Sequence, residues 1–138
     1  MIIITAKEYL ECVRLADIKI NIKYKELHTL ELKTTQISVQ TIRERVQSSG
    51  SSDPMRIIDK IADMQAEIDA EIDKYIDLRN EARTMINQLA DNRYRVVLTE
   101  YYLNNKTWEQ VAEFMGYSLR WVYRLHDSAL IDFSKILN

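Results

Sequence analysis

Breakers of regular secondary structure are almost absent from this chain, and that scarcity is what most constrains its fold. Only 2 Gly and 1 Pro occur among 138 residues. A fold of many strands needs a turn about every 8–12 residues, and such turns depend on Gly and Pro. Long helices need few breakers, so the sequence predicts an all-α protein.

The first 90 residues carry two long amphipathic patterns. A capping box at Thr5 and Glu8 starts a helix that we expect to run to about Gln47, although its signal weakens after residue 34, where a second short helix is an alternative. A second helix is predicted from Pro54 to about Ala90. Its apolar residues repeat every seven positions at Ile61, Ile68, Tyr75, Ala82 and Leu89.

Neither helix can bury its apolar stripe alone. We therefore expect residues 1–90 to form a long antiparallel helical hairpin, coiled-coil-like, with a flexible connection near 48–53 where Ser48-Ser49-Gly50-Ser51-Ser52 stands. The same heptad faces would allow a homodimer through the hairpin.

Residues 91–138 form the second predicted domain. Asp91 or Asn92 caps a helix over 93–103, and a break follows at 104–106. Thr107 and Gln110 then form a second capping box. We expect the helix that starts there to end at Gly116, a residue that tolerates a left-handed cap, and Ser118 to cap a last helix running to about Ile136.

The spacing of apolar residues around Gly116 favours a helix-turn-helix. A small residue, Ala112, stands where two helices would cross closely, and Val122 and Leu125 would anchor the second helix to the first. A bare helical hairpin would satisfy part of this pattern. The two caps, the glycine and the anchors together favour DNA binding. Arg120 and Arg124 lie four residues apart on one helix face, as a pair that reads the major groove would.

Residues 94–130, from Tyr-Arg-Val-Val-Leu-Thr-Glu-Tyr-Tyr-Leu through Thr-Trp-Glu-Gln-Val-Ala-Glu-Phe-Met-Gly-Tyr-Ser to Val-Tyr-Arg-Leu-His-Asp-Ser-Ala-Leu, resemble region 4 of the sigma-70 family factors. The whole chain resembles a small protein family of phages and prophages of Gram-positive bacteria, described as sigma-like or as late transcription regulators. The resemblance implies binding to double-stranded DNA in the major groove, docking on host RNA polymerase, and a place in the cytoplasm of a bacterial host cell.

Carried over residue by residue, the resemblance implies base contacts at Leu119, Arg120, Tyr123 and Arg124, and a capping hydroxyl at Ser118 that also meets a phosphate. Leu119 and Tyr123 depart from the charged or amide side chains that sigma factors mostly carry there. They offer only a thymine-methyl contact or a single hydroxyl.

Two residues complete the predicted DNA-binding set. Lys106 and Thr107 stand just before the first helix of the pair, where a lysine charge and a capping hydroxyl can meet phosphates.

Other functions find little support in the sequence. The 2 His and 1 Cys do not make a metal site, and no phosphate-binding glycine loop or catalytic motif occurs, so we expect no enzyme, no cofactor, no metal and no small-molecule substrate. Charged residues follow Ile4 closely and no long apolar run occurs, so we expect neither a signal peptide nor a membrane partner.

An alternative function is that of a helical protein-interaction or assembly protein, including a small-terminase-like DNA packaging factor, in which the helix-turn-helix is mainly structural. Residues 91–138 hold six basic and six acidic residues, which weakens a stand-alone DNA binder. Among single residues, we expect Trp108 and Cys12 in the core, Trp121 as a half-buried anchor and His126 at the surface.

Overall fold

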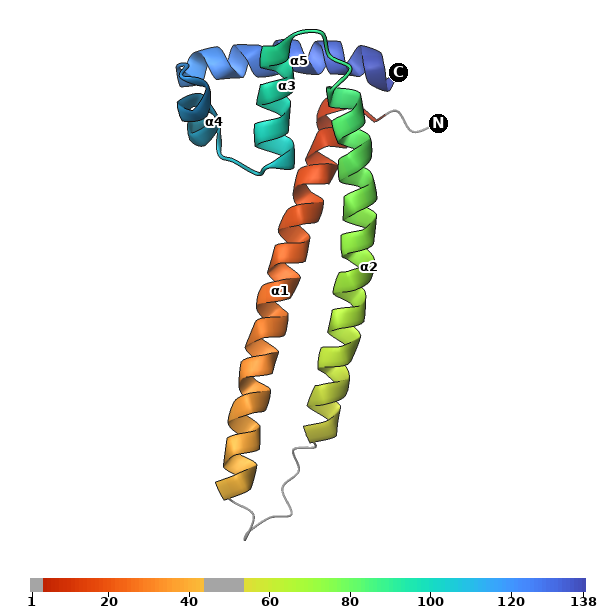
Figure 1. Ribbon diagram of the computed structural model, residues 1–138, viewed down its shortest axis with the longest axis vertical. Helices are drawn as coiled ribbons and strands as arrows, with labels where there is room; N and C mark the ends of the chain where they lie inside the picture. The colour runs from red at the N-terminus through yellow and green to blue at the C-terminus, as the bar shows by residue number, and fades with distance from the viewer. Residues whose placement is uncertain (1–3, 44–53) are drawn as a thin grey trace. The chain divides into compact units, whose positions relative to one another are not determined.

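The computed structural model describes residues 4–43 and 54–138, and gives only the backbone of residues 37–43 and Pro54. These residues form α1 (Ala6–Arg43), α2 (Pro54–Ile86), α3 (Asn92–Leu98), η1 (Thr99–Leu103), α4 (Trp108–Met115) and α5 (Leu119–Leu137) (Figure 1). Within the described ranges no strand occurs, so the predicted all-α class is confirmed. The expected connection at 48–53 lies outside them.

Local capping explains where several helices begin. The Thr5 hydroxyl accepts a hydrogen bond from the Glu8 amide at 3.2 Å, and the Glu8 carboxylate accepts one from the Thr5 amide at 3.4 Å, so the predicted capping box is present. The Asp91 carboxylate accepts a hydrogen bond from the Arg93 amide at 2.9 Å and caps α3.

α1 continues as one helix through the region where its sequence signal is weak. The hydroxyls of Thr34 and Thr35 donate hydrogen bonds to the carbonyls of Leu30 and Glu31, four residues earlier. These bonds satisfy the threonine side chains inside the helix, so the residues do not end it. The alternative of a second short helix is therefore wrong as far as Arg43.

The chain divides into two compact units, and each contains parts of α1 and α2. The smaller unit, Ile18–Asp73, consists of the later part of α1 and the earlier part of α2, which lie side by side (Figure 1). Ile20 and Leu27 of α1 and Ile68 of α2 are buried in this unit. Lys23 Nζ lies 2.6 Å from Glu71 Oε1, an ion pair between the two helices. The predicted domains 1–90 and 91–138 stay a prediction.

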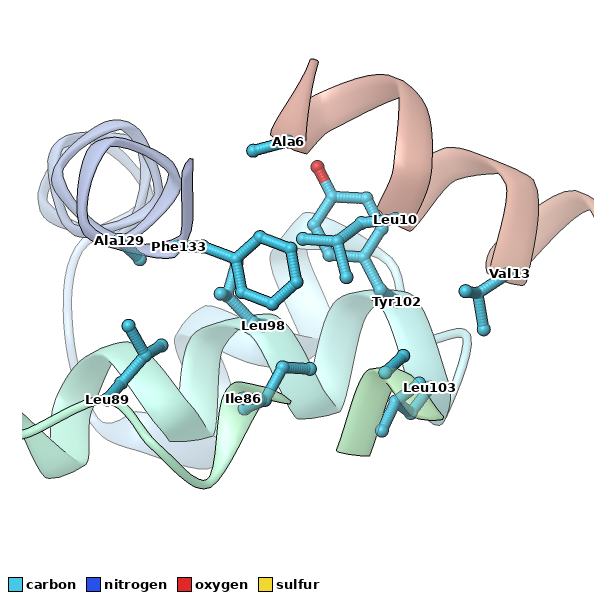
Figure 2. Close-up of a cluster of buried hydrophobic side chains, with 11 residues drawn as sticks. Ala6, Leu10, Val13, Ile86, Leu89, Leu98, Tyr102, Leu103, Ala129 and Phe133 are labelled. Atoms are coloured by element: carbon cyan, nitrogen blue, oxygen red, sulfur yellow. The ribbon is translucent and has the colours of Figure 1, made fainter. Parts of the chain in front are cut away.

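The larger unit combines Met1–Asp17 with Lys74–Asn138. Figure 2 shows its core, where apolar side chains from the start of α1, the end of α2, α3, η1 and α5 meet. Leu10, Ile86, Leu98, Tyr102 and Phe133 are almost completely buried there. Residues far apart in sequence thus hold α3 and α5 against the ends of the two long helices.

α2 ends at Ile86, a few residues earlier than predicted. The chain turns at Asn87 and Gln88, whose amides bond to the carbonyls of Arg83 and Met85. Leu89 nevertheless stays buried, because the turn directs its side chain into the core (Figure 2). The apolar repeat therefore predicts burial at this position correctly, although the helix has already ended.

The predicted helix over 93–103 changes its winding half-way. After Leu98 the chain forms a π-helical turn, η1, in which the Asn104 amide donates to the Thr99 carbonyl five residues earlier. The wider turn lets the neighbouring residues Tyr102 and Leu103 both reach the core, while Tyr101 stays half-buried. The break at 104–106 follows as predicted, with Asn105 in a left-handed conformation at φ 53°.

Cys12 is exposed, so its expected place in the core is wrong. The core side of α1 is formed there by Leu10 and Val13, and Cys12 lies on the helix surface between them. At about 100° per residue, two residues beyond Leu10 point to nearly the opposite side of the helix.

Candidate nucleic-acid interface

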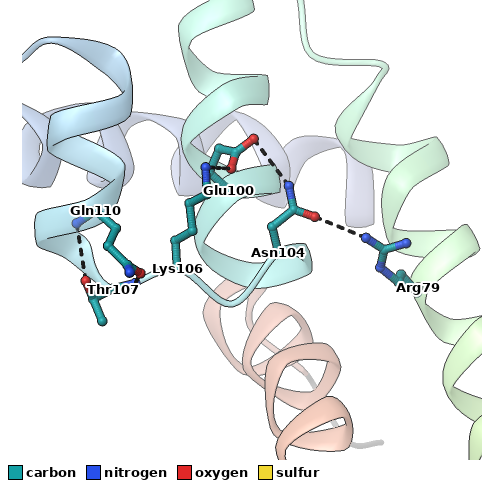
Figure 3. Close-up of polar contacts among 6 residues, drawn as sticks. All are labelled: Arg79, Glu100, Asn104, Lys106, Thr107 and Gln110. Atoms are coloured by element: carbon teal, nitrogen blue, oxygen red, sulfur yellow. Dashed lines mark hydrogen bonds and ion pairs between the residues drawn. The ribbon is translucent and has the colours of Figure 1, made fainter.

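α4 is a short helix closed at both ends by local hydrogen bonds. The Thr107 hydroxyl accepts from the Gln110 amide at 3.2 Å, and the Gln110 side chain accepts from the Thr107 amide at 2.9 Å (Figure 3). At the other end Gly116 takes φ 72°, and the amides of Gly116 and Tyr117 donate to the carbonyls of Glu113 and Ala112. This pairing is a Schellman motif, which requires a residue that tolerates the left-handed region.

α5 begins at Leu119, three residues after Gly116. The Ser118 hydroxyl accepts a hydrogen bond from the Trp121 amide at 3.2 Å and caps the helix as predicted. Val111, Ala112 and Val122 are buried between α4 and α5. Trp108, Met115 and Leu119 pack against them from the edge. Ala112 thus lies at the contact of the two helices, where the sequence placed it.

The predicted DNA-contacting residues of α5 differ in exposure. Arg120 and Arg124 are exposed, and Tyr123 keeps 42% of its surface. Leu119 is half-buried against the α4–α5 contact. At about 100° per residue, Arg120 and Arg124 lie some 40° apart on the side of α5 opposite Val122. Asp127, whose side chain is 81% exposed, shares that side.

The basic residues of 91–138, a stretch that the structure describes throughout, fall into two groups. Four have partners: Arg93 with Asp91 at 3.0 Å, Arg95 with the Leu89 carbonyl, Lys106 with Glu100 at 2.7 Å and Lys135 with Asp132 at 3.8 Å. The guanidinium groups of Arg120 and Arg124 have no hydrogen-bond or ion-pair partner among the described residues. The unpaired positive charge of this stretch therefore lies on one face of α5.

Lys106 is held within the chain. Its ammonium group pairs with Glu100 and also lies 4.1 Å from the centre of the Phe114 ring. The Lys106–Glu100 ion pair is part of a longer chain of polar contacts (Figure 3). The Asn104 side chain donates a hydrogen bond to Glu100 at 3.2 Å and accepts one from Arg79 at 3.1 Å. A phosphate contact at Lys106 would require the lysine to break its ion pair with Glu100. The neighbouring Thr107 is exposed, and its hydroxyl accepts the capping hydrogen bond from the Gln110 amide.

His126 is buried, so its expected place at the surface is wrong. Only 7% of its surface is exposed, and its Nε2 lies 2.7 Å from the Tyr102 hydroxyl. Burial lowers its pKa to about 4; the nearby Asp127 carboxylate opposes this shift and the Lys7 ammonium adds to it. Burial also raises the pKa of Tyr102, so the phenol stays protonated and is able to donate to the neutral His126 ring.

The two tryptophans differ in environment. Trp108, expected in the core, is half-buried at its edge and stacks on Tyr101, with ring centres 3.7 Å apart. Trp121 is exposed to 39%, so its expected place as a half-buried anchor is wrong; among the described rings it lies near Tyr117, with the centres 6.5 Å apart.

Sequence reasoning missed the contribution of α1 to this region. The Arg14 guanidinium donates to the carbonyls of Tyr101 and Lys106, and Asn105 donates to Asp17. These pairs lie about ninety residues apart in sequence, and no local pattern could have indicated them.

The sequence model of the family described as "Protein of unknown function (DUF1492)" matches residues 37–134, more than half of the chain. The chain belongs to this family. The DUF1492 match includes all of α3, η1 and α4 and most of α5. Neither the curated proteins nor the solved structures contain a match.

Residues 4–43 and 54–138 of this DUF1492 protein offer neither a cluster of metal ligands nor a membrane-spanning helix. No group of three or more His, Cys, Asp or Glu side chains in those ranges could hold a metal ion. None of the helices there has the length and apolar character needed to cross a lipid bilayer.

Proposed function

We propose that this protein is a non-enzymatic, DNA-binding transcription regulator. In this proposal α1 and α2 form a long antiparallel hairpin, and α4 and α5 form a helix-turn-helix of the sigma region 4 type. α5 enters the major groove of double-stranded DNA. The observation that carries the proposal is the pair of partnerless guanidinium groups, Arg120 and Arg124, on the exposed face of α5.

Except for Lys106, which pairs with Glu100, the residues of the predicted set have surroundings that support a role in binding. Arg120 and Arg124 are free to make bidentate contacts with guanine. Tyr123 and Leu119 flank them with a hydroxyl and an apolar contact. The capping hydroxyls of Ser118 and Thr107 are exposed and lie at helix starts, where phosphates bind favourably.

Affinity from this face alone is expected to be low. Asp127 places a carboxylate beside the two arginines, and Lys106 is neutralised by Glu100. We expect about 2–4 phosphate contacts, a shallow salt dependence and weak binding by a single copy. A tether is therefore part of the proposal: docking on the RNA polymerase of a bacterial host cell, or a homodimer.

The smaller unit offers a surface for such a homodimer. Ile18, Ile22 and Leu32 of α1 are exposed and stand at heptad-related positions, apart from the buried Ile20 and Leu27. A second apolar stripe of this kind is typical of helices that pair with another copy.

A second candidate function is that of an assembly protein, in which α4 and α5 bind another protein. The observation in its favour is the exposure of Phe114, Tyr117 and Trp121 around the α4–α5 turn. Exposed aromatic side chains are common in protein interfaces.

The test uses the full chain and a duplex selected by that chain from random sequences, with fluorescence anisotropy as the readout. Arg120→Ala and Arg124→Ala should each weaken specific binding by about 5- to 150-fold, since a bidentate arginine–guanine contact contributes about 1–3 kcal/mol. Lys135→Ala is the matched control, because it removes a paired cation of the same helix. Asp127→Asn should strengthen binding.

Circular dichroism establishes that each variant is folded. If Arg120→Ala, Arg124→Ala and Lys135→Ala all lose the same affinity for the duplex, the loss comes from net charge alone. That result would refute the reading of bases by α5. Failure to select any duplex, with or without polymerase, would favour the assembly protein. In that case Trp121→Ala should disrupt the complex instead.

A further inference from the structure

The larger unit contains a cavity of about 240 Å³ whose walls come from α1, η1, α4 and α5. We propose that this cavity binds an organic cation, an alkylammonium or guanidinium group. The proposal does not depend on DNA binding. It concerns a different part of the molecule from the Arg120 and Arg124 guanidinium groups, although Tyr123 and Asp127 of α5 line it.

Four of the aromatic rings that line the cavity give it the geometry of an aromatic box. The Trp108 ring meets Tyr123 at an interplanar angle of 76° and His126 at 67°, with ring centres 5.6 and 4.6 Å away. Tyr101 stacks nearly parallel to Trp108, at 12°, and covers one of its faces. Tyr123 and His126 thus stand roughly perpendicular to Trp108, and all four rings line the cavity. Clusters of aromatic rings are how proteins bind alkylammonium groups.

The same ring cluster already holds a guanidinium of this chain. The Arg14 guanidinium carbon lies 4.2 Å from the centre of the Tyr101 ring. Because Trp108 stacks on Tyr101 at 3.7 Å, the arginine must occupy the other face of that ring. The aromatic cluster is therefore an environment in which a cation is stably accommodated.

The charges at the cavity favour a positive ligand. Among the lining residues Glu11 and Asp127 contribute two carboxylates and Lys7 one ammonium group, while the Arg14 guanidinium lies outside the lining, over the Tyr101 ring. The Asp127 side chain is 81% exposed, so the cavity opens to solvent on that side. His126 adds no positive charge near neutral pH, since burial lowers its pKa to about 4.

The size of the cavity selects the part of a ligand that it can hold. A volume of about 240 Å³ is below the range of about 300–1,000 Å³ found for complete drug-sized ligands. A trimethylammonium or guanidinium head fits, while the remainder of the ligand must extend through the open side. A small amine and a basic side chain of a partner protein share this chemistry.

Tryptophan fluorescence of the full chain can report on this cavity directly. The chain has only two tryptophans, so a Trp121→Phe background leaves Trp108 as the sole reporter. The probes are choline, its neutral isostere 3,3-dimethylbutan-1-ol, and N-acetyl-arginine amide, all at constant ionic strength. We expect saturable changes with both cations and none with the neutral alcohol.

Paired variants test the walls and the charges of the cavity. Tyr123→Leu should weaken choline binding about two- to fivefold, while Tyr123→Phe, which keeps the ring, should not. Glu11→Gln should weaken binding by a few-fold and Lys7→Gln should strengthen it. Glu113→Gln is the control for charge, because it removes an exposed carboxylate that does not line the cavity.

Two outcomes would overturn the proposal. One is an equal response to choline and to the neutral alcohol, and the other is equal affinity in the Glu11→Gln and Glu113→Gln variants. Either cation binding alone supports the site. If an arginine-containing peptide binds much more tightly than N-acetyl-arginine amide, the natural ligand is a basic side chain of a partner protein. If the two bind with equal affinity, the natural ligand is a small molecule. No DNA is present, so failure here leaves the DNA-binding proposal to its own test.

Discussion

The buried pair of His126 and Tyr102 makes the stability of the larger unit depend on pH. His126 has a folded-state pKa of about 4 against an ordinary value of 6.5, and burial is the main cause. The folded protein therefore takes up a proton less readily than the unfolded chain. The contribution of His126 to stability is complete above pH 6.5 and is lost as pH falls from 6.5 towards 4.

The size of the effect follows from these two values. Each unit of pKa difference corresponds to about 1.4 kcal/mol once both forms are fully protonated. Between pH 7 and pH 5 the unfolded-state histidine becomes protonated while most of the folded-state histidine stays neutral. The free energy of unfolding should therefore fall by about 2 kcal/mol over this range through His126 alone.

Urea unfolding followed by tryptophan fluorescence at several pH values measures this loss. His126→Gln is the informative variant, because its amide can accept the Tyr102 hydrogen bond but does not titrate. His28→Gln is the matched control, since it removes the other histidine of the chain from an exposed position. The His126→Gln protein should lose about 2 kcal/mol less than the other two proteins on going from pH 7 to pH 5.

Carboxylates titrate near and below pH 4.5, so the comparison is made between proteins at the same pH. The reasoning is refuted if wild type and His126→Gln show the same decrease in the free energy of unfolding between pH 7 and pH 5. That result would mean that His126 titrates in the folded protein as it does in the unfolded chain.

The remaining predictions concern the helices α4 and α5 and the turn between them. Ala112→Leu should destabilise the protein by about 1–3 kcal/mol through overpacking against Val122, measured by urea unfolding, with amide hydrogen exchange showing lost protection in α4 and α5. Gly116→Ala should cost about 1–2 kcal/mol, because the position has φ 72° although no atom would contact the new methyl group; Gly116→Asn should cost less in the same assay. Thr107→Ala should cost about 1 kcal/mol by loss of the cap, and Thr107→Ser should restore most of it.

Features set by neighbours in sequence could be predicted closely. The caps at Thr5, Asp91, Thr107 and Ser118 and the left-handed Gly116 are all present. Each depends on a side chain that bonds to an amide two or three residues away, or on the conformational freedom of one glycine. Such choices are made almost entirely by local sterics and hydrogen bonding.

Features set by distant packing could not be predicted. The π-helical turn exists where Tyr102 and Leu103 both become buried against α1 and α2 residues. The burial of His126 depends on Tyr102, twenty-four residues earlier, and on the rings around it. The local signal for His126 was its helical spacing, since it stands four residues after Val122 and three before Ala129, on the buried face of α5.

The charge of the candidate DNA-binding face also depends on the fold, and not on composition alone. Counting residues gives 91–138 six basic and six acidic side chains, which predicts no electrostatic preference for DNA. The folded chain pairs four of the basic residues with acids or carbonyls and leaves Arg120 and Arg124 unpaired on one helix face. A phosphate backbone at this face would respond mainly to the two arginines and Asp127, because opposite charges in a pair offset each other and salt screens charges farther away than about 8–10 Å. The salt dependence of binding should therefore change when Asp127 is neutralised, and stay the same when the Lys135–Asp132 pair is removed as a whole.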